Sequence, residues 1–357
     1  MVDDCTNYII CFENGCLGCS HSRDKNVVMC TPIHIVMTPV RNESWVLRAF
    51  LEATSLWADY IIIADQMSTD GSREIAKEYP KVILIDNKNP EFNEAERQSM
   101  LIAKAREVAA GRDTLLWGLD ADEILAANTF ETEDWKHILN SKPGDVFWFK
   151  WAEICPNQKE YWLSPSTYYP WLFHDDGKEP HGNYVRNMHS MRIPYPKDEK
   201  QMYHVDDFRV LHLAYLNQNR VASKRRFYQF VDWEMNHRSP ISLNRSYAQT
   251  KKNNQIIALQ ETFLYKKDRY SFDLLDMVDT EVSKCYMDDY IVERFSRHSW
   301  RELRKLDIWD EVFLKNYNQK NPQRSVDKMV HSYLRKTALK NDILWVRMID
   351  KILKKLY

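Results

Sequence analysis

Short apolar runs alternate with stretches of helical periodicity in the first part of the chain. The runs cover residues 33–37, 60–64, 82–85 and 115–119, and each is apolar nearly throughout, as buried strands are. Between the runs, apolar residues recur every three to four positions, as in the helix expected from Ser44 onward. Near-continuously apolar strands that alternate with helices are typical of a mostly parallel sheet covered by helices. The pattern therefore predicts an α/β fold.

The helices between these strands carry start and stop signals. Ser44 is expected to be the N-cap of the first helix. A helix after Asn93 gains a capping box from Glu96, and Gly111 suits its C-terminal end. We therefore expect the helices to begin directly after the loops that follow the strands.

The pattern changes after the fourth strand. Residues 146–151 resemble one more strand, whereas 155–210 is rich in Pro, Trp, Tyr and His and shows little periodicity. Long irregular stretches are often binding loops, and aromatic rings offer flat surfaces to sugars. Residues 215–357 contain no glycine and predict a mainly helical region.

The length of 357 residues suggests one catalytic domain with an appended piece. We expect a Cys-rich extension over 1–31, an α/β domain over 32–240 and a helical region over 241–357. The apolar content of 44% is ordinary for a soluble protein, and a net charge of −1 argues against a general nucleic-acid binder. The sequence has neither an apolar run of 18 residues nor a signal peptide at its start, so we expect a cytoplasmic protein.

Five of the seven cysteines lie within the first 30 residues. Cys11, Cys16, Cys19 and Cys30 could supply a tetrahedral structural zinc site. Only the Cys16-x-x-Cys19 pair has the usual spacing, and free thiols in a loose extension are the alternative that we favour.

The fourth apolar run ends in three acids, Asp120, Asp122 and Glu123. Burying an ionised carboxylate is costly, so these acids should lie just past the carboxyl end of the strand, where open α/β sheets bind ligands. Asp120 and Asp122 could together hold one divalent cation, which can neutralise a leaving diphosphate. The alternative is a solvated acidic turn. No Gly-x-Gly-x-x-Gly or Walker-type loop follows the first strand, which argues against dinucleotide and P-loop sites.

Four segments together resemble the family 2 glycosyltransferases, which have the GT-A fold. The segments are Pro39-Val40-Arg41-Asn42-Glu43, Ala64-Asp65-Gln66-Met67-Ser68-Thr69-Asp70-Gly71-Ser72, Phe92-Asn93-Glu94-Ala95-Glu96-Arg97 and Leu119-Asp120-Ala121-Asp122-Glu123. The segment 210–215 is similar to a His-x-x-Tyr element of many bacterial members. The resemblance implies transfer of a sugar, with inversion, from a nucleotide sugar, most often a UDP-sugar, to a hydroxyl of a glycan, lipid-linked glycan or protein. It also implies a place in bacterial polysaccharide or lipopolysaccharide biosynthesis.

The resemblance also assigns residues to the donor site. Glu43 and Asp65 would contact the nucleoside, and Arg97 would face the diphosphate. For Asp70 the alternative is the capping of a turn, and for Arg97 it is a solvated position on a helix. The full set expected to bind the nucleotide sugar is Pro39, Arg41, Glu43, Asp65, Asp70, Arg97 and Asp120.

The resemblance further implies a metal site and a general base. Asp120 and Asp122 would hold Mn²⁺ or Mg²⁺, and His212 would complete the ligands, unless it is a structural histidine. A carboxylate should deprotonate the acceptor hydroxyl. His189 is followed by Ser190 where relatives often carry an acid, so the base stays open. The candidates are Asp206 and Asp207 first, and Glu153 second.

Two other functions fit parts of this pattern. A nucleotidyltransferase also uses paired acids, but it usually has a glycine-rich first loop, and residues 38–43 contain no glycine. A catalytically inactive protein that binds carbohydrate or a partner is the second alternative, and the intact pair of Asp120 and Asp122 argues against it.

The C-terminal residues 334–357 carry seven basic side chains and two acids. Their apolar residues recur at helical spacing, and Trp345 is available for an interface. A basic amphipathic helix of this kind can lie in the headgroup region of an anionic membrane. This predicts peripheral contact with the inner face of the cytoplasmic membrane, which would suit a lipid-linked acceptor. The alternative, which we favour slightly, is a terminal helix that packs on the protein with a solvated basic face.

Overall fold

The computed structural model describes residues 31–164, 166–179, 190–195, 202–248, 255–264, 274–281, 285–340 and 342–357. Residues 32–357 group into one compact unit. The four cysteines of the expected zinc site lie outside the described residues, as do His189 and nearly all of the expected extension over 1–31. Those predictions therefore stay untested.

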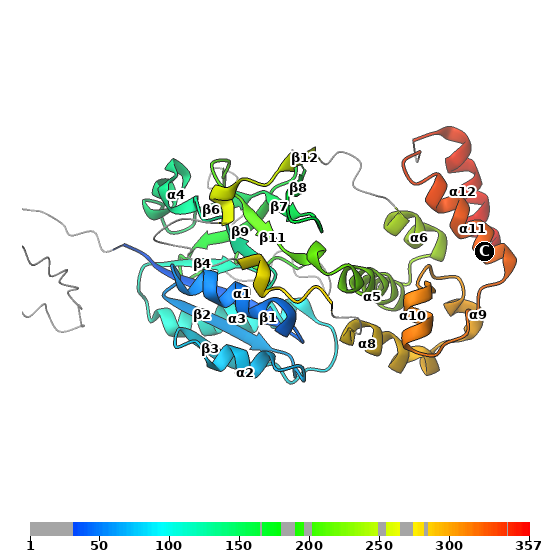
Figure 1. The fold of residues 1–357 in the computed structure, drawn as a ribbon, viewed down its shortest axis with the longest axis horizontal. Coiled ribbons are helices and arrows are strands. Elements are labelled where there is room, and N and C mark those ends of the chain that lie inside the picture. The colour runs from blue at the N-terminus through cyan, green and yellow to red at the C-terminus, as the bar shows by residue number, and fades with distance from the viewer. Residues whose placement is uncertain are drawn as a thin grey trace, which may run out of the picture. The chain divides into compact units, whose positions relative to one another are not determined.

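A seven-stranded sheet forms the centre of the α/β part (Figure 1). Its strand order is β10-β6-β9-β4-β1-β2-β3. β1 pairs in parallel with β2 and β4, and β2 pairs in parallel with β3, whereas β9 runs antiparallel to β4 and β6. The α/β class with a mostly parallel sheet is confirmed. The strands are β1 (Ile33–Val40), β2 (Tyr60–Asp65), β3 (Val82–Asp86), β4 (Thr114–Gly118), β6 (Val146–Phe149), β9 (Tyr169–His174) and β10 (Met202–His204).

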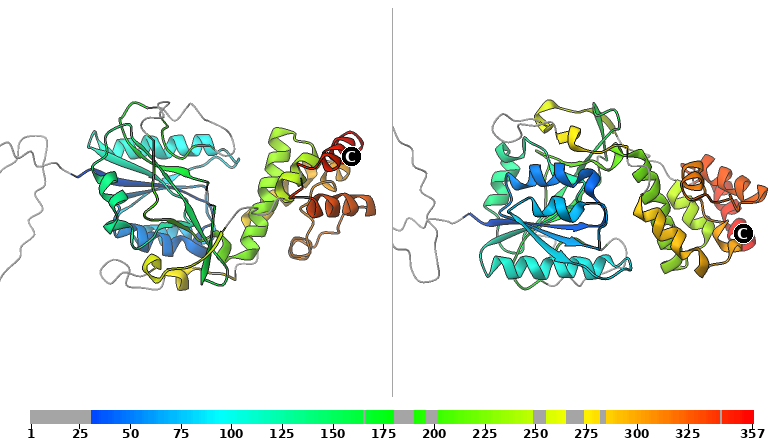
Figure 2. Two further views of the ribbon diagram at one scale, coloured as in Figure 1. Left: turned by 90° about the horizontal axis from the view of Figure 1, so that it is seen from above. Right: turned by 60° about the horizontal axis from the view of Figure 1, so that its bottom comes forward.

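Helices cover both faces of this sheet (Figure 2). Alternate residues of β1 point to opposite faces, because side chains alternate along a strand. Val36 packs in one buried cluster with Phe50 of α1, whereas Met37 packs in another with Leu101 of α3. The helices of this part are α1 (Ser44–Ser55), α2 (Ser72–Lys77), α3 (Glu94–Ala109) and α4 (Glu133–Leu139).

A second sheet has the order β12-β8-β7-β11-β5, and its edge strand β5 begins at Glu123, directly after the acidic turn. β11 pairs with both β5 and β7, and this register sets His212 opposite Glu123 on one side and Glu153 on the other. The sequence shows little periodicity over 155–210, yet β8, β9 and β10 form there, because strands of three to six residues are too short to display a period. The strands are β5 (Glu123–Leu125), β7 (Trp151–Ile154), β8 (Glu160–Leu163), β11 (Val210–His212) and β12 (Gln255–Ala258).

The expectation of a mainly helical C-terminal region is confirmed, with β12 as a strand within it. α5 begins before the expected boundary at residue 240, and its Phe227 and Phe230 share a buried cluster with Ile291 of α8. The helices are α5 (Gln218–Asn236), α6 (Pro240–Ala248), α7 (Glu261–Leu264), α8 (Tyr286–Arg294), α9 (Trp300–Leu303), α10 (Glu311–Asn316), α11 (Ser325–Lys336) and α12 (Leu344–Leu356).

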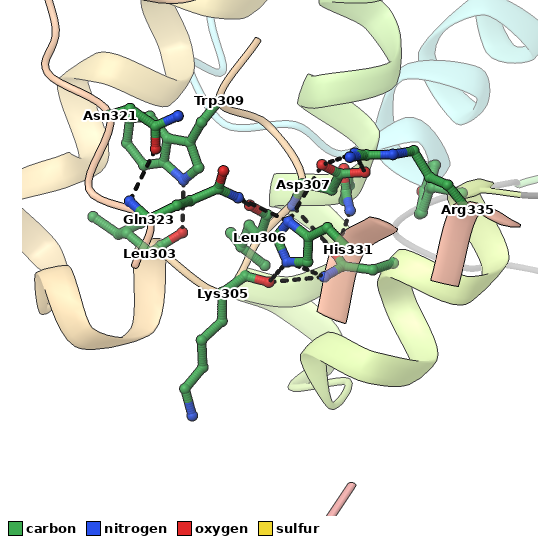
Figure 3. Close-up of polar contacts among 12 residues, drawn as sticks. Leu303, Lys305, Leu306, Asp307, Trp309, Asn321, Gln323, His331 and Arg335 are labelled. Carbon is green, nitrogen blue, oxygen red and sulfur yellow. Dashed lines mark hydrogen bonds and ion pairs between the residues drawn. The ribbon is translucent and has the colours of Figure 1, made fainter. Parts of the chain in front are cut away.

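A polar network around the buried His331 fixes α11 in this region (Figure 3). Its Nε2 lies 3.0 Å from the carbonyl oxygen of Lys305, and its Nδ1 lies 2.8 Å from Nε2 of Gln323. One turn further along α11, Arg335 binds Asp307 at 2.8 Å. Because both side chains bind the segment that follows α9, α11 is held firmly against it.

Candidate functional site

The loop after β1 is tied to the loop after β2 by hydrogen bonds from side chains. Ser44, which we expected to be an N-cap, is instead the first residue of α1, and Glu43 holds the cap position. Oδ2 of Asp70 accepts the Ser44 N–H at 2.9 Å, and Oγ of Ser72 accepts the Glu43 N–H at the same distance. The carbonyl oxygen of Glu43 accepts the N–H groups of Val46 and Leu47, so the hydrogen bonds of the helix begin at Glu43 and not at Ser44. These contacts of Asp70 fit the capping alternative.

Asp65 ends β2 and is buried. Its Oδ2 accepts from Nη1 of Arg73 at 2.7 Å and from the Ser68 N–H at 3.2 Å. Its Oδ1 is buried without a hydrogen-bond partner among the described residues. A buried acceptor without a partner is costly, so Oδ1 is suited to a donor group from a ligand.

Glu43 joins the first loop to α5. Its carboxylate forms an ion pair with Arg220 of α5 and accepts the indole N–H of Trp45 at 2.8 Å. Burial raises the pKa of Glu43 to about 7, although the neighbouring Arg220 opposes this shift. Arg41 lies over the ring of Tyr286, 5.0 Å from its centroid, so α8 also meets this loop.

The acidic turn after β4 is held by Arg192. Its guanidinium binds Oδ2 of Asp120 at 2.5 Å and Oε2 of Glu123 at 2.6 Å. A side chain at Gly118 would not fit here, because its Cβ would lie 2.7 Å from Cβ of Arg192. The glycine that ends β4 therefore lets Arg192 approach the acids, and Asp120 points toward this guanidinium.

Three side chains at the turn could hold a metal ion. Asp122, Glu123 and His212 are buried, and each offers one ligand atom within 4.8 Å of the other two. Oδ2 of Asp122 lies 3.6 Å from Nε2 of His212, whose ring stacks on Trp151. Carboxylate oxygens suit Mn²⁺ and Mg²⁺, and the neutral imidazole of histidine is a common metal ligand. The donor set therefore fits the expected cation; it includes Glu123, and Asp120 is not part of it.

Two cations from helices face this acidic group. Nζ of Lys224, on α5, lies 3.9 Å from Oδ2 of Asp122. Burial alone would raise the pKa of Asp122, but Lys224 and His212 hold that pKa well below its usual range. Arg97, on α3, has a buried Nε without a hydrogen-bond partner among the described residues. Its guanidinium can therefore still donate to an anionic ligand.

The acids and cations lie where two cavities meet. A cavity of about 430 Å³ has aromatic walls from Trp151, Tyr169, Trp171 and Tyr215. A smaller cavity of about 70 Å³ is lined by Pro39, Arg41 and Glu43 from the first loop and by Asp122. The residues that line both cavities are Arg97, Asp120, Lys224 and Tyr228. A ligand that fills the smaller cavity would thus reach the charged groups at the edge of the larger one.

The three candidate bases lie in different places. Glu153 lines the larger cavity, on the strand next to His212. Asp206 is exposed and pairs with Lys150 at 2.8 Å, and Oδ2 of Asp207 accepts the Asp134 N–H at 3.2 Å. Neither aspartate is among the residues that line the two cavities. Only Glu153 is placed to meet a substrate there.

Sequence reasoning missed several residues of this arrangement. Glu123 carries a signal, because it directly follows Asp122 in the sequence. Arg192, Arg220 and Lys224 carry none, because they lie on distant segments without a motif, and only the fold brings them to the acids.

Residues 35–196 match the family model of glycosyl transferase family 2. The matched range includes the first two loops, the acidic turn, Glu153 and Arg192. This match covers less than half of the chain, and it includes all four segments that resemble the family 2 glycosyltransferases. None of the curated proteins that were compared with the sequence matches it.

Three solved structures illustrate the likeness. GalNAc-T7 with UDP, GalNAc and Mn²⁺ shares 17% identity at a TM-score of 0.27, over 36% of this chain and 24% of that chain. A mycobacterial protein shares 18% identity at a TM-score of 0.25, over 34% and 41%. Glucosyl-3-phosphoglycerate synthase from Mycobacterium tuberculosis, in complex with Mn²⁺, UDP and glucosyl-3-phosphoglycerate, shares 18% identity at 0.24, over 34% and 44%. The matched region therefore spans less than half the length of each of these structures.

Proposed function

We propose that the protein transfers a sugar from a nucleoside diphosphate sugar, with UDP as the expected nucleotide, to an acceptor hydroxyl with inversion. The observation that carries this proposal is the junction of the two cavities. There Asp122, which with Glu123 and His212 forms the buried group, lies 3.9 Å from Lys224, and Arg97 lines both cavities. Departure of a sugar from a diphosphate needs positive charge at this kind of place, because negative charge grows on the leaving group.

The smaller cavity is the proposed nucleotide site. Pro39, Arg41 and Glu43 line it. Asp65 does not line this cavity, but it ends the neighbouring strand β2, and its buried Oδ1 would accept a hydrogen bond from the nucleoside. Arg97 and Lys224, which line both cavities, would bind the diphosphate.

Asp122, Glu123 and His212 would hold Mn²⁺ or Mg²⁺. Asp120 lies next to this group, because Arg192 binds both Asp120 and Glu123. When bound, this cation supplies positive charge that stabilises the departing diphosphate. Asp122 is suited to a metal because its pKa is held low, so its carboxylate stays ionised when a cation arrives.

The larger cavity is the proposed acceptor site, with Glu153 as the general base. Its aromatic walls offer flat apolar surfaces to a sugar ring, and Glu153 would take the proton of the attacking hydroxyl. We favour a glycan or lipid-linked glycan acceptor in bacterial polysaccharide biosynthesis, carried out in the cytoplasm. The support for this finer assignment is the aromatic wall together with the resemblance of the four sequence segments.

The test is turnover of a panel of nucleotide sugars, with and without Mn²⁺. Release of nucleoside diphosphate in the presence of Mn²⁺ is the expected result. Release of pyrophosphate from a sugar phosphate and a nucleoside triphosphate would instead indicate a nucleotidyltransferase. Binding of nucleotide sugar without any turnover, across the panel and a set of glycan acceptors, would indicate an inactive binding protein.

A further inference from the structure

One face of α12 is docked firmly on the protein. Val346 is completely buried, and Leu353 packs in a cluster with Ile241 of α6. The guanidinium of Arg245, also on α6, binds both carboxylate oxygens of Asp350 at 2.6 and 2.9 Å. The orientation of the helix is therefore fixed, and with it the faces that it presents to solvent.

A second face of α12 is apolar and exposed. Leu344, Met348, Ile352 and Leu356 follow one another every four residues, and they are 71%, 57%, 54% and 80% exposed. We call these four side chains the apolar row. Eight of the fifteen exposed large hydrophobic side chains in the described part of the chain lie between residues 339 and 356. Such a concentration marks an interaction surface, because soluble proteins rarely leave contiguous apolar patches uncovered.

Basic side chains border the apolar row. Arg347, Lys351, Lys354 and Lys355 of α12 are all exposed, and the described residues provide no ion-pair partner for them. Lys351 and Lys355 are helical neighbours of the apolar row, since they lie three residues after Met348 and Ile352. The single acid of the helix, Asp350, is already bound to Arg245. The exposed surface of α12 is therefore apolar along one line and positive beside it.

We propose that α12 binds the surface of an anionic lipid bilayer. The apolar row would enter the boundary between headgroups and acyl chains, and the bordering cations would bind lipid phosphates. Within the described residues, no helix is both long and apolar enough to cross a membrane, so the contact is peripheral. A second copy of the chain could cover the apolar row, but its own cations would meet those of the first copy. An anionic lipid surface would both cover the apolar row and pair with the bordering cations.

This inference rests on α12 alone and is independent of the proposed transfer reaction. Its test is flotation of the full chain with vesicles of phosphatidylcholine, alone or mixed with phosphatidylglycerol. We expect the protein to float with the anionic vesicles at low salt and to remain unbound with phosphatidylcholine alone. Raising the salt should reduce the bound fraction about tenfold, because screening shortens the reach of the lysine charges.

Two sets of variants sharpen the test. The triple variant Leu344→Gln, Met348→Gln and Ile352→Gln changes only exposed side chains, so the fold should persist, as circular dichroism can check. Its binding to anionic vesicles should fall by more than about tenfold, since these residues supply most of the apolar area that would be buried in the membrane. The pair Lys351→Gln and Lys355→Gln should weaken binding to anionic vesicles at low salt.

The matched control is Val326→Gln with Met329→Gln, which removes two exposed apolar side chains from α11. It should float like the unmodified chain. Failure of the unmodified chain to float on anionic vesicles at low salt would overturn the proposal, as would undiminished flotation of the triple variant. If light scattering instead finds a dimer that the triple variant abolishes, the apolar row serves self-association and the proposal is wrong.

Discussion

Nζ of Lys224 lies 3.9 Å from Oδ2 of Asp122, so a cation from α5 faces the acid that ends the turn after β4. His212 approaches the same oxygen at 3.6 Å. Asp122 stays ionised despite its burial because these two groups hold its pKa down. The helical region thus contributes charge to the site at the edge of the sheet.

The metal assignment predicts the effect of Asp122→Asn. This change keeps the shape of the side chain and removes its charge, so folding should persist while transfer falls by at least about a hundredfold. EDTA should abolish transfer by the unmodified protein, and added Mn²⁺ should restore it. The control is Glu133→Gln on α4, where an exposed acid pairs with Lys136. Full activity of Asp122→Asn, or of the unmodified protein in EDTA, would contradict the assignment.

The general base can be identified by a comparison of two acids. Glu153→Gln should lower the rate of transfer by about 10²–10⁴, because the acceptor hydroxyl loses its proton acceptor. Calorimetric affinity for nucleoside diphosphate should not change, since Glu153 lines only the larger of the two cavities. Asp207→Asn is the control and should remain active. If instead Asp207→Asn lowers the rate of transfer and Glu153→Gln does not, the general base lies in the segment around Asp207.

Local patterns were enough to predict the framework of the site. The strands β1, β2 and β4 are apolar runs. The acids that follow them were expected at the carboxyl ends of these strands, because burying an ionised carboxylate within the sheet is costly. The resemblance, and not the local pattern, named His212 beside Asp122, and the structure sets the two side chains 3.6 Å apart. The pairing of Asp120 with Arg192 could not be predicted, since it depends on a distant segment that crosses Gly118 at close range.

The same limit explains the difference at Asp70. Its sequence position in the second loop fits a ligand role, but its hydrogen bond to the Ser44 N–H depends on how two loops approach each other. Likewise, a short aromatic strand such as β9 carries no periodicity, and its place beside β4 is decided by packing of the whole sheet. Long-range contacts, which leave no local signal, therefore determined most of what the sequence did not reveal.

Asp65→Ala tests the nucleoside site. Removal of Oδ1 should weaken nucleoside diphosphate binding by about 1–3 kcal/mol, the cost of losing a charge-assisted hydrogen bond. The change also deprives Arg73 of one partner, so the control is Asp86→Ala, which removes the other partner of Arg73 at 2.8 Å. Titration calorimetry on both folded variants separates the effects. Equal affinities for both variants and the unmodified protein would show that Asp65 does not bind the nucleoside.

The buried His34 predicts a pH dependence of stability. Its Nδ1 accepts the indole N–H of Trp117 at 3.2 Å, and its ring stacks on Trp135, so the fold holds the neutral ring. Burial lowers the pKa of His34 from 6.5 to about 4, although Asp59 opposes this shift. Between these two pH values the unfolded chain binds a proton at this histidine and the folded chain does not. The free energy of unfolding should therefore fall as the pH drops from about 6.5 toward 4, by about 3 kcal/mol from this group alone.

Urea unfolding at several pH values between 4 and 7 measures this contribution. Carboxylates also titrate in this range. The informative quantity is therefore the difference in the pH dependence of the free energy of unfolding between the unmodified protein and His34→Phe. His34→Phe should be less stable at pH 7, because Trp117 loses its acceptor, but its stability should decline less steeply toward pH 4. The control His204→Phe changes an exposed histidine of β10 and should keep the slope of the unmodified protein. Parallel curves for His34→Phe and the unmodified protein would show that folding does not lower the pKa of His34, and would contradict the prediction.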